Sequence, residues 1–160
     1  MDPNIASHMA IFKKNYLVFG LPDEAINEIA ELAEYRVGLA GERLVTKGEK
    51  SSDLFVILDG HVNVYGPDGG KISTIDAPSI IGEIALVDDL ERTADAACVG
   101  MVKCARLPGK ELRKYMSKKK EFGFTMLSNL SRVLSMRLRN TNVSLVNLME
   151  KTHDMWKNVT

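Results

Sequence analysis

The chain has 160 residues, with Lys plus Arg and Asp plus Glu equal at 21 each. This length suits one compact domain with a real core and is too short for two domains of ordinary size. The balanced charge excludes a global field that would attract nucleic acid or an anionic membrane, and the apolar runs stay far below the roughly 18 residues that span a bilayer. We therefore expect a single soluble, cytoplasmic module.

The first predicted element is a helix that begins near Pro22. Residues 1–9 show no amphipathic period and end in Ser-His-Met, which looks like a cloning remnant, so we leave them out of the expected fold and place the domain at 10–151. Pro22 is followed by two acids, as a first helical turn prefers. Apolar residues then recur at helical spacing and predict a helix to about Tyr35.

Short β-branched and apolar runs separated by glycines occupy the stretch from about 36 to 107. Such a pattern is typical of a small antiparallel β-barrel or jelly roll. The runs 53–58 and 61–65 are joined by Asp59-Gly60, which favours a tight hairpin turn. We therefore predict an α+β fold, in which this barrel has a helix before it and a long helix after it.

Helical patterns fill the C-terminal part, about 108–151, before a short tail at 152–160. Pro108 begins one helix, and a longer one is predicted from about Lys119 to Lys151. The longer helix carries an apolar stripe of Leu127, Leu130, Leu134, Leu138, Leu145 and Leu148. The stripe either pairs with a second chain, giving a homodimer, or folds back on its own barrel.

The stretch from Ile81 to Ala94 combines groups that suit an anionic ligand. Gly82 allows close backbone approach, and the turn after it offers N–H groups. Arg92 supplies a planar fork for two phosphate oxygens, whereas Glu83 suits a hydroxyl donor. From spacing alone, Glu83 and Arg92 are equally compatible with an ordinary surface pair.

Gly-Glu-Ile-Ala-Leu at 82–86, with Arg-Thr-Ala at 92–94, resembles the phosphate-binding cassette of the cyclic nucleotide-binding domain family. That family includes the bacterial catabolite activator protein and the regulatory subunits of cyclic-nucleotide-dependent kinases. The resemblance extends over roughly residues 17 to 150 and is supported by Lys47-Gly48-Glu49 and by Leu54 to Gly60. In many members a proline stands at the position of Glu91, whose charge would weaken binding if it pointed inward.

The resemblance implies that Arg92 holds the cyclic phosphate and that Glu83 accepts a hydrogen bond from the ribose 2′-hydroxyl. Thr93 would touch the phosphate or a syn guanine, and without ligand Arg92 is expected to face solvent. Residues 137–148 resemble the catabolite activator's dimer helix. Thr141 would then reach the purine amino group, although it could instead bond to the Arg137 carbonyl, and Asn142 would reach the other subunit's ligand. The full predicted ligand-binding set is Gly82, Glu83, Ile84, Ala85, Arg92, Thr93, Ala94, Thr141 and Asn142.

The remaining motifs favour regulation over catalysis. No Ser-His-Asp, Cys-His or close carboxylate pair appears, and Cys98 and Cys104 read as buried reduced thiols rather than metal ligands. Lys118-Lys119-Lys120 reads as a solvated helix start, and no direct nucleic-acid or membrane binding is expected. We predict a sensor domain that needs no cofactor and binds cAMP in preference to cGMP. Ligand binding is expected to favour docking of the long helix, and an effector domain or a partner protein would respond to this change. The alternative is a family member that has lost ligand binding and serves as a dimerisation or interaction module.

Overall fold

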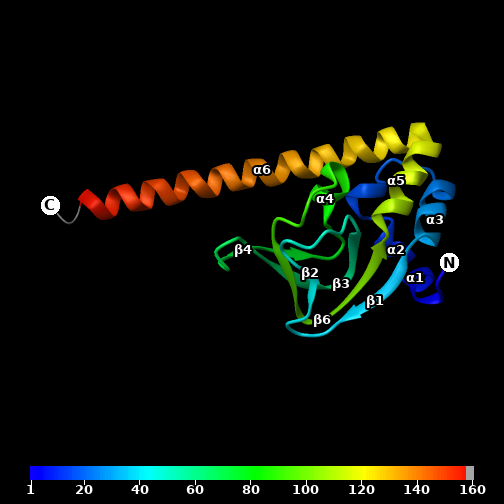
Figure 1. Ribbon diagram of the computed structural model, residues 1–160, viewed down its shortest axis with the longest axis horizontal. Helices are drawn as coiled ribbons and strands as arrows, with labels where there is room; N and C mark the ends of the chain where they lie inside the picture. The colour runs from blue at the N-terminus through cyan, green and yellow to red at the C-terminus, as the bar shows by residue number, and fades with distance from the viewer. Residues whose placement is uncertain (158–160) are drawn as a thin grey trace.

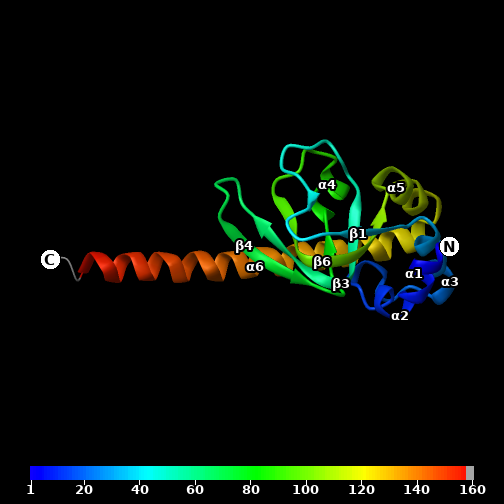
Figure 2. The same cartoon turned by 90° about the horizontal axis from the view of Figure 1, so that it is seen from below.

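The computed structural model describes the backbone of residues 1–157 and the side chains of residues 1–151. A six-stranded antiparallel sheet forms the centre of the molecule. The N-terminal helices and α5 gather at one end of this sheet, and α6 runs past it and extends far beyond it (Figures 1 and 2).

Four short helical segments precede the sheet. They are α1 (Pro3–Ser7), α2 (Met9–Phe12), the 3-10 helix η1 (Tyr16–Val18) and α3 (Asp23–Glu31). Helix α3 begins after Pro22, its N-cap, as predicted, with Asp23 and Glu24 in its first turn. Its predicted end near Tyr35 is wrong, because α3 ends at Glu31 and Tyr35 lies in β1. Leaving residues 1–9 out of the fold was wrong, since Ile5 of α1 is completely buried in the main core.

The strands are β1 (Glu34–Gly38), β2 (Arg43–Val45), β3 (Leu54–Tyr65), β4 (Lys71–Asp76), β5 (Ile80–Ile81) and β6 (Asp95–Leu107). They pair in the order β1-β6-β3-β4, with β2 beside β6 and β5 beside β3. The pairing does not return from β4 to β1, so the antiparallel sheet is confirmed and its closure into a barrel is not.

The predicted hairpin at Asp59-Gly60 is wrong, because β3 runs through this dipeptide as one strand. Gly60 has φ 83° and lies where the register between β3 and β6 shifts. A Cβ there would come within 2.7 Å of the Met101 carbonyl oxygen. The glycine therefore serves a β-bulge, and the chain reverses instead at Gly66–Gly70, where the Gly66 N–H donates to the Gly70 carbonyl.

Three helices complete the fold: α4 (Glu83–Asp88), α5 (Gly109–Lys118) and α6 (Lys120–Lys157). Helix α5 begins after Pro108 as predicted. Helix α6 continues past the predicted end at Lys151, and the side chains of the predicted tail, 152–160, lie outside the described residues. No helix in the described part of the chain is long and apolar enough to cross a membrane.

The beginning of α6 packs on the main core, whereas beyond Val133 none of its described side chains belongs to that core. Met126, Leu130 and Val133 are buried against the N-terminal helices and the sheet. Leu138 and Leu145 are 62% and 54% exposed, and the C-terminal part of α6 extends past the sheet (Figure 1). The predicted stripe thus folds back on its own domain only in its first half.

Candidate functional site

Gly82 places the first turn of α4 against the strand and loop beneath it. Its φ is 93°, and a Cβ would come within 2.5 Å of the Asp53 carbonyl oxygen and 2.6 Å of Arg92 Nη1. A left-handed backbone with no room for a side chain requires glycine. The predicted close approach at Gly82 is thus made by the protein's own groups.

Glu83, the first residue of α4, is only 2% exposed. Its Oε1 accepts a hydrogen bond from Nη1 of Arg137 in α6, and Arg137 Nη2 donates to the Ile80 carbonyl at 2.6 Å. Glu83 Oε2 is buried and has no hydrogen-bond partner within the described residues. The Arg137 side chain was not among the predicted site residues, although its position one helical turn before Thr141 was a usable signal.

Arg92 is turned into the protein and is 5% exposed. Its Nη1 donates to the Gly82 carbonyl at 3.2 Å, and its Nη2 donates to the Asp53 carbonyl at 2.5 Å and to Ser51 Oγ at 3.3 Å. The expectation that Arg92 faces solvent is therefore wrong, because backbone carbonyls at this point offer it acceptors. Burial lowers the pKa of the Arg92 guanidinium, although the charge of Asp53 opposes this shift.

Asp53 joins this arginine to the start of α5. Its backbone carbonyl accepts from Arg92, its Oδ1 accepts from the Gly109 N–H at 2.9 Å, and its Oδ2 accepts from Arg106 Nε at 2.8 Å. Burial alone would raise the pKa of Asp53, but the hydrogen bonds from Gly109 and Arg106 outweigh it and hold the pKa below its ordinary value. Nothing in the sequence distinguished Asp53 from an ordinary residue at the start of a strand.

The other residues of the predicted cassette differ in how exposed they are. Ala85 is buried, Ala94 is half-buried, and Ile84 and Thr93 are exposed. Glu91 points outward, where it lies 3.9 Å from Lys50 Nζ. The structure thus brings Gly82, Glu83 and Arg92 together.

Thr141 and Asn142 are exposed and lie farther along α6 than Arg137. Thr141 Oγ1 donates to the Arg137 carbonyl at 3.0 Å, the alternative that the sequence analysis had left open. Across the described residues, no group of three or more His, Cys, Asp or Glu side chains could hold a metal ion.

The fold is that of a small α+β domain, in which a short helix, α4, lies between an antiparallel sheet and a long C-terminal helix. Residues 36–119 match the family model of the cyclic nucleotide-binding domain, which is more than half of the chain. The chain therefore belongs to the cyclic nucleotide-binding domain family, as its resemblance indicated.

The relatives include proteins of different overall function. A CRP-like cAMP-activated global transcriptional regulator of Mycobacterium tuberculosis is 31% identical over 113 residues, covering 68% of this chain and 49% of that protein. Glutaminase 1 of Bradyrhizobium diazoefficiens is 26% identical over 129 residues, covering 81% of this chain and 21% of that enzyme. The chain thus spans half or less of the length of these curated relatives.

Solved structures agree on the fold. The catabolite activator protein of Thermus thermophilus superposes with a TM-score of 0.70 at 21% identity, covering 83% of this chain and 62% of that one. Together with the family match, this confirms the predicted fold family.

Proposed function

We propose that this domain is a sensor that binds a cyclic nucleotide in the cassette from Gly82 to Ala94, with cAMP preferred over cGMP. The observation that carries the proposal is Glu83 Oε2, a buried carboxylate oxygen for which the described residues provide no hydrogen-bond partner. Buried acceptors in native proteins are almost always paired, and leaving one unpaired is costly. A ribose 2′-hydroxyl is a donor of the right size to satisfy it.

The phosphate would be held by Arg92. Its guanidinium now donates to neutral carbonyl and hydroxyl oxygens of Gly82, Asp53 and Ser51. Exchanging these neutral acceptors for phosphate oxygens would pair the guanidinium with an anion, in a bidentate geometry that adds both energy and specificity. Glu91 is turned away toward Lys50, so it does not oppose an anion at this position.

The preference for cAMP rests on Thr141. This residue is one helical turn from Arg137, and residues four apart lie on the same helix face. Because Arg137 contacts Glu83, Thr141 projects toward the side of α6 that would cover a purine. The similarity to a regulator described as cAMP-activated supports the same choice, whereas Thr93 in the cassette is compatible with cGMP.

The switch would act through the contact between α4 and α6. A ligand that engages Glu83 changes the surroundings of the group that anchors Arg137, so its affinity depends on how α6 is docked. The exposed half of the apolar stripe, which includes Leu138, Leu145 and Leu148, would pair with the same helix of a second copy. Asn142 would then approach the partner's ligand.

One observation favours the alternative of an interaction module that binds no nucleotide. Both terminal nitrogens of Arg92 already donate to protein acceptors, so these nitrogens do not need a ligand to complete their hydrogen bonds. In either case we propose that the domain performs no chemistry on the nucleotide.

Calorimetric titration with cAMP, cGMP and 5′-AMP decides between these functions. We expect saturable binding of both cyclic nucleotides, tighter for cAMP, and much weaker binding of 5′-AMP. Absence of heat with every nucleotide, for a protein with native circular dichroism, would establish the interaction module instead. Chromatography of the titrated cAMP should recover it unchanged, and any hydrolysis would contradict a purely regulatory role.

A further inference from the structure

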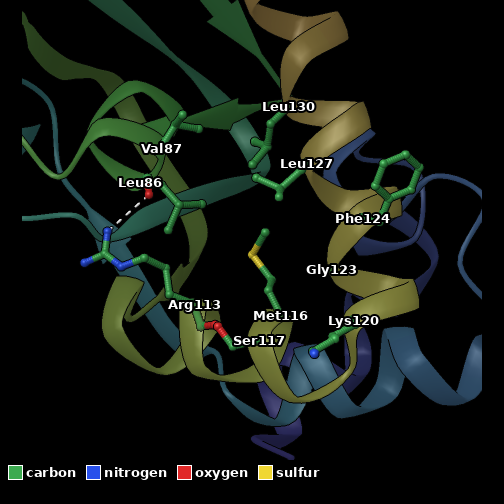
Figure 3. Close-up of a pocket in the computed structure, with 10 residues that line it drawn as sticks. All are labelled: Leu86, Val87, Arg113, Met116, Ser117, Lys120, Gly123, Phe124, Leu127 and Leu130. Carbon is green, nitrogen blue, oxygen red and sulfur yellow. Dashed lines mark hydrogen bonds between the residues drawn. The ribbon is translucent and has the colours of Figure 1, made fainter.

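A groove of about 380 Å³ lies where α4, α5 and α6 meet. Leu86 of α4, Met116 of α5 and Leu127 of α6 point toward one another across it (Figure 3). Leu86 and Leu130 are almost fully buried and form its floor, while Val87 and Leu127 are about half exposed and form its walls. The groove is therefore an apolar depression that is open to solvent on one side.

This groove is separate from the proposed nucleotide site. Helix α6 meets α4 at two places, at Arg137 beside Glu83 and at Leu127 and Leu130 beside Leu86. Ten residues separate Leu127 from Arg137, which is about 15 Å along a helix. None of the groove's lining residues belongs to the predicted ligand-binding set.

The charged side chains at the groove are cationic. The Arg113 guanidinium already has partners within the protein, because it donates to the Leu86 carbonyl at 3.1 Å and to Asp89 Oδ1 at 2.7 Å. Lys120 lies at the end of the groove near Met116 (Figure 3). It is exposed, and no carboxylate of the described residues lies within ion-pairing distance of it. Within the described part of the chain no acidic residue lines the groove, so the positive charge of Lys120 stands uncompensated beside an apolar surface.

We propose that this groove binds a single-chain amphipathic carboxylate, such as a free fatty acid. The alkyl chain would lie against Leu86, Met116 and Leu127, and the carboxylate would pair with Lys120. Ligand pockets range over about 300–1,000 Å³, so this groove suits one chain rather than a two-chain lipid. Its apolar walls and the positive charge of Lys120 match an apolar tail with one negative head.

Titration with dodecanoate below its micelle concentration tests the site, with dodecanol and dodecyltrimethylammonium as matched probes of charge. We expect saturable binding of dodecanoate with one site per chain, weaker binding of dodecanol and none of the cation. Lys120→Glu should weaken dodecanoate binding by about three- to tenfold, the range of one exposed ion pair turned into a repulsion. Lys118→Glu changes the same charge outside the groove and should leave the affinity unchanged.

A second variant tests the apolar part without loss of the fold. Leu127 is 48% exposed, so Leu127→Trp should fill the groove, abolish dodecanoate binding and leave the melting temperature unchanged. The proposal is overturned if Lys118→Glu and Lys120→Glu weaken binding equally, or if dodecanoate stays bound to Leu127→Trp. It is equally overturned if Glu83→Gln abolishes dodecanoate binding, which would place the carboxylate in the nucleotide site. Binding to phosphatidylglycerol vesicles without binding of free dodecanoate would assign the groove to a membrane surface.

Discussion

Glu83 at the start of α4 and Arg137 in α6 are joined by a hydrogen-bonded ion pair across 54 residues of chain. One oxygen of the carboxylate holds the long helix, and the other is buried with no hydrogen-bond partner in the part of the chain that the structure describes. The group proposed to recognise the ligand is therefore also the group that docks α6. This shared carboxylate is a direct physical route by which ligand binding and helix position would influence each other.

Glu83→Gln tests recognition of the ribose. Since a hydrogen bond to a charged acceptor contributes about 1.5–3 kcal/mol, we expect cAMP affinity to fall roughly ten- to a hundredfold. The affinity for 2′-deoxy-cAMP, which lacks the hydroxyl, should change much less. Calorimetry with both ligands measures the difference, and an equal loss for both would show that Glu83 acts only through Arg137.

Arg92→Ala should abolish most of the rise in melting temperature that saturating cAMP produces, because a ligand specific to the folded state stabilises it by RT ln(1 + [L]/Kd). Arg92→Lys should retain part of the shift, since lysine supplies charge without the bidentate fork. Because Arg92 is buried and bonded to the Gly82 and Asp53 carbonyls, Arg92→Ala should also lower the melting temperature without ligand. Arg132→Ala, at an exposed arginine, is the matched control, and a full cAMP shift in both Arg92 variants would place the phosphate elsewhere.

Asp53→Asn tests the link between Arg92 and α5 through its pH dependence. The pKa of Asp53 is lower in the folded protein than in the unfolded chain, so its charge stabilises the fold above pH about 4. That contribution is lost as the pH falls through the lower folded value. The melting temperature of Asp53→Asn should thus fall below that of the wild type at pH 7, and the gap should shrink toward pH 3. A gap that stays constant with pH would mean that the variant disturbs packing rather than charge, and Asp23→Asn in the exposed pair with Lys13 is the control.

The starts of two helices could be predicted from the sequence, because they depend on residues that are neighbours in the chain. Pro22 and Pro108 precede helices because proline suits the start of a helix. Asp59-Gly60 gave a wrong prediction of a hairpin, because a left-handed glycine serves a bulge inside a strand as well as a hairpin turn. Only the partner strand β6 decides between the two, and that pairing is not encoded locally.

In the candidate site, too, contacts between residues far apart in the sequence could not be predicted. Gly82, Glu83 and Arg92 were predicted from spacing and resemblance, and the structure brings them together. The partners that hold them were not predicted, since Asp53 and Arg137 are 39 and 45 residues distant from Arg92 in the sequence. Contacts over such separations follow from how the sheet and α6 pack, which periodicity does not reveal.

Thr141→Ala tests the purine contact. The Thr141 hydroxyl now bonds to the Arg137 carbonyl, so a ligand must attract it away from a weak internal bond. We expect cAMP binding to weaken by about 1 kcal/mol, with little change in melting temperature without ligand. Inosine 3′,5′-cyclic phosphate lacks the purine amino group and should bind the wild type and the variant equally. An equal loss for both nucleotides, measured by calorimetry, would assign the effect to helix packing.

Leu138→Glu combined with Leu145→Glu tests the dimer. These leucines are 62% and 54% exposed, so two charges there cost the single chain little, whereas in a helix pair they would lose apolar burial and face their own copies. The variant should elute as a folded monomer, with wild-type circular dichroism and half the mass by light scattering. Asn140→Glu with Asn147→Glu adds the same charges on the opposite side of the helix, about half a turn away at 3.6 residues per turn, and should leave the mass unchanged. If the leucine variant keeps the wild-type mass, or if the wild type is itself monomeric with cAMP bound, the exposed half of α6 does not pair with a second copy.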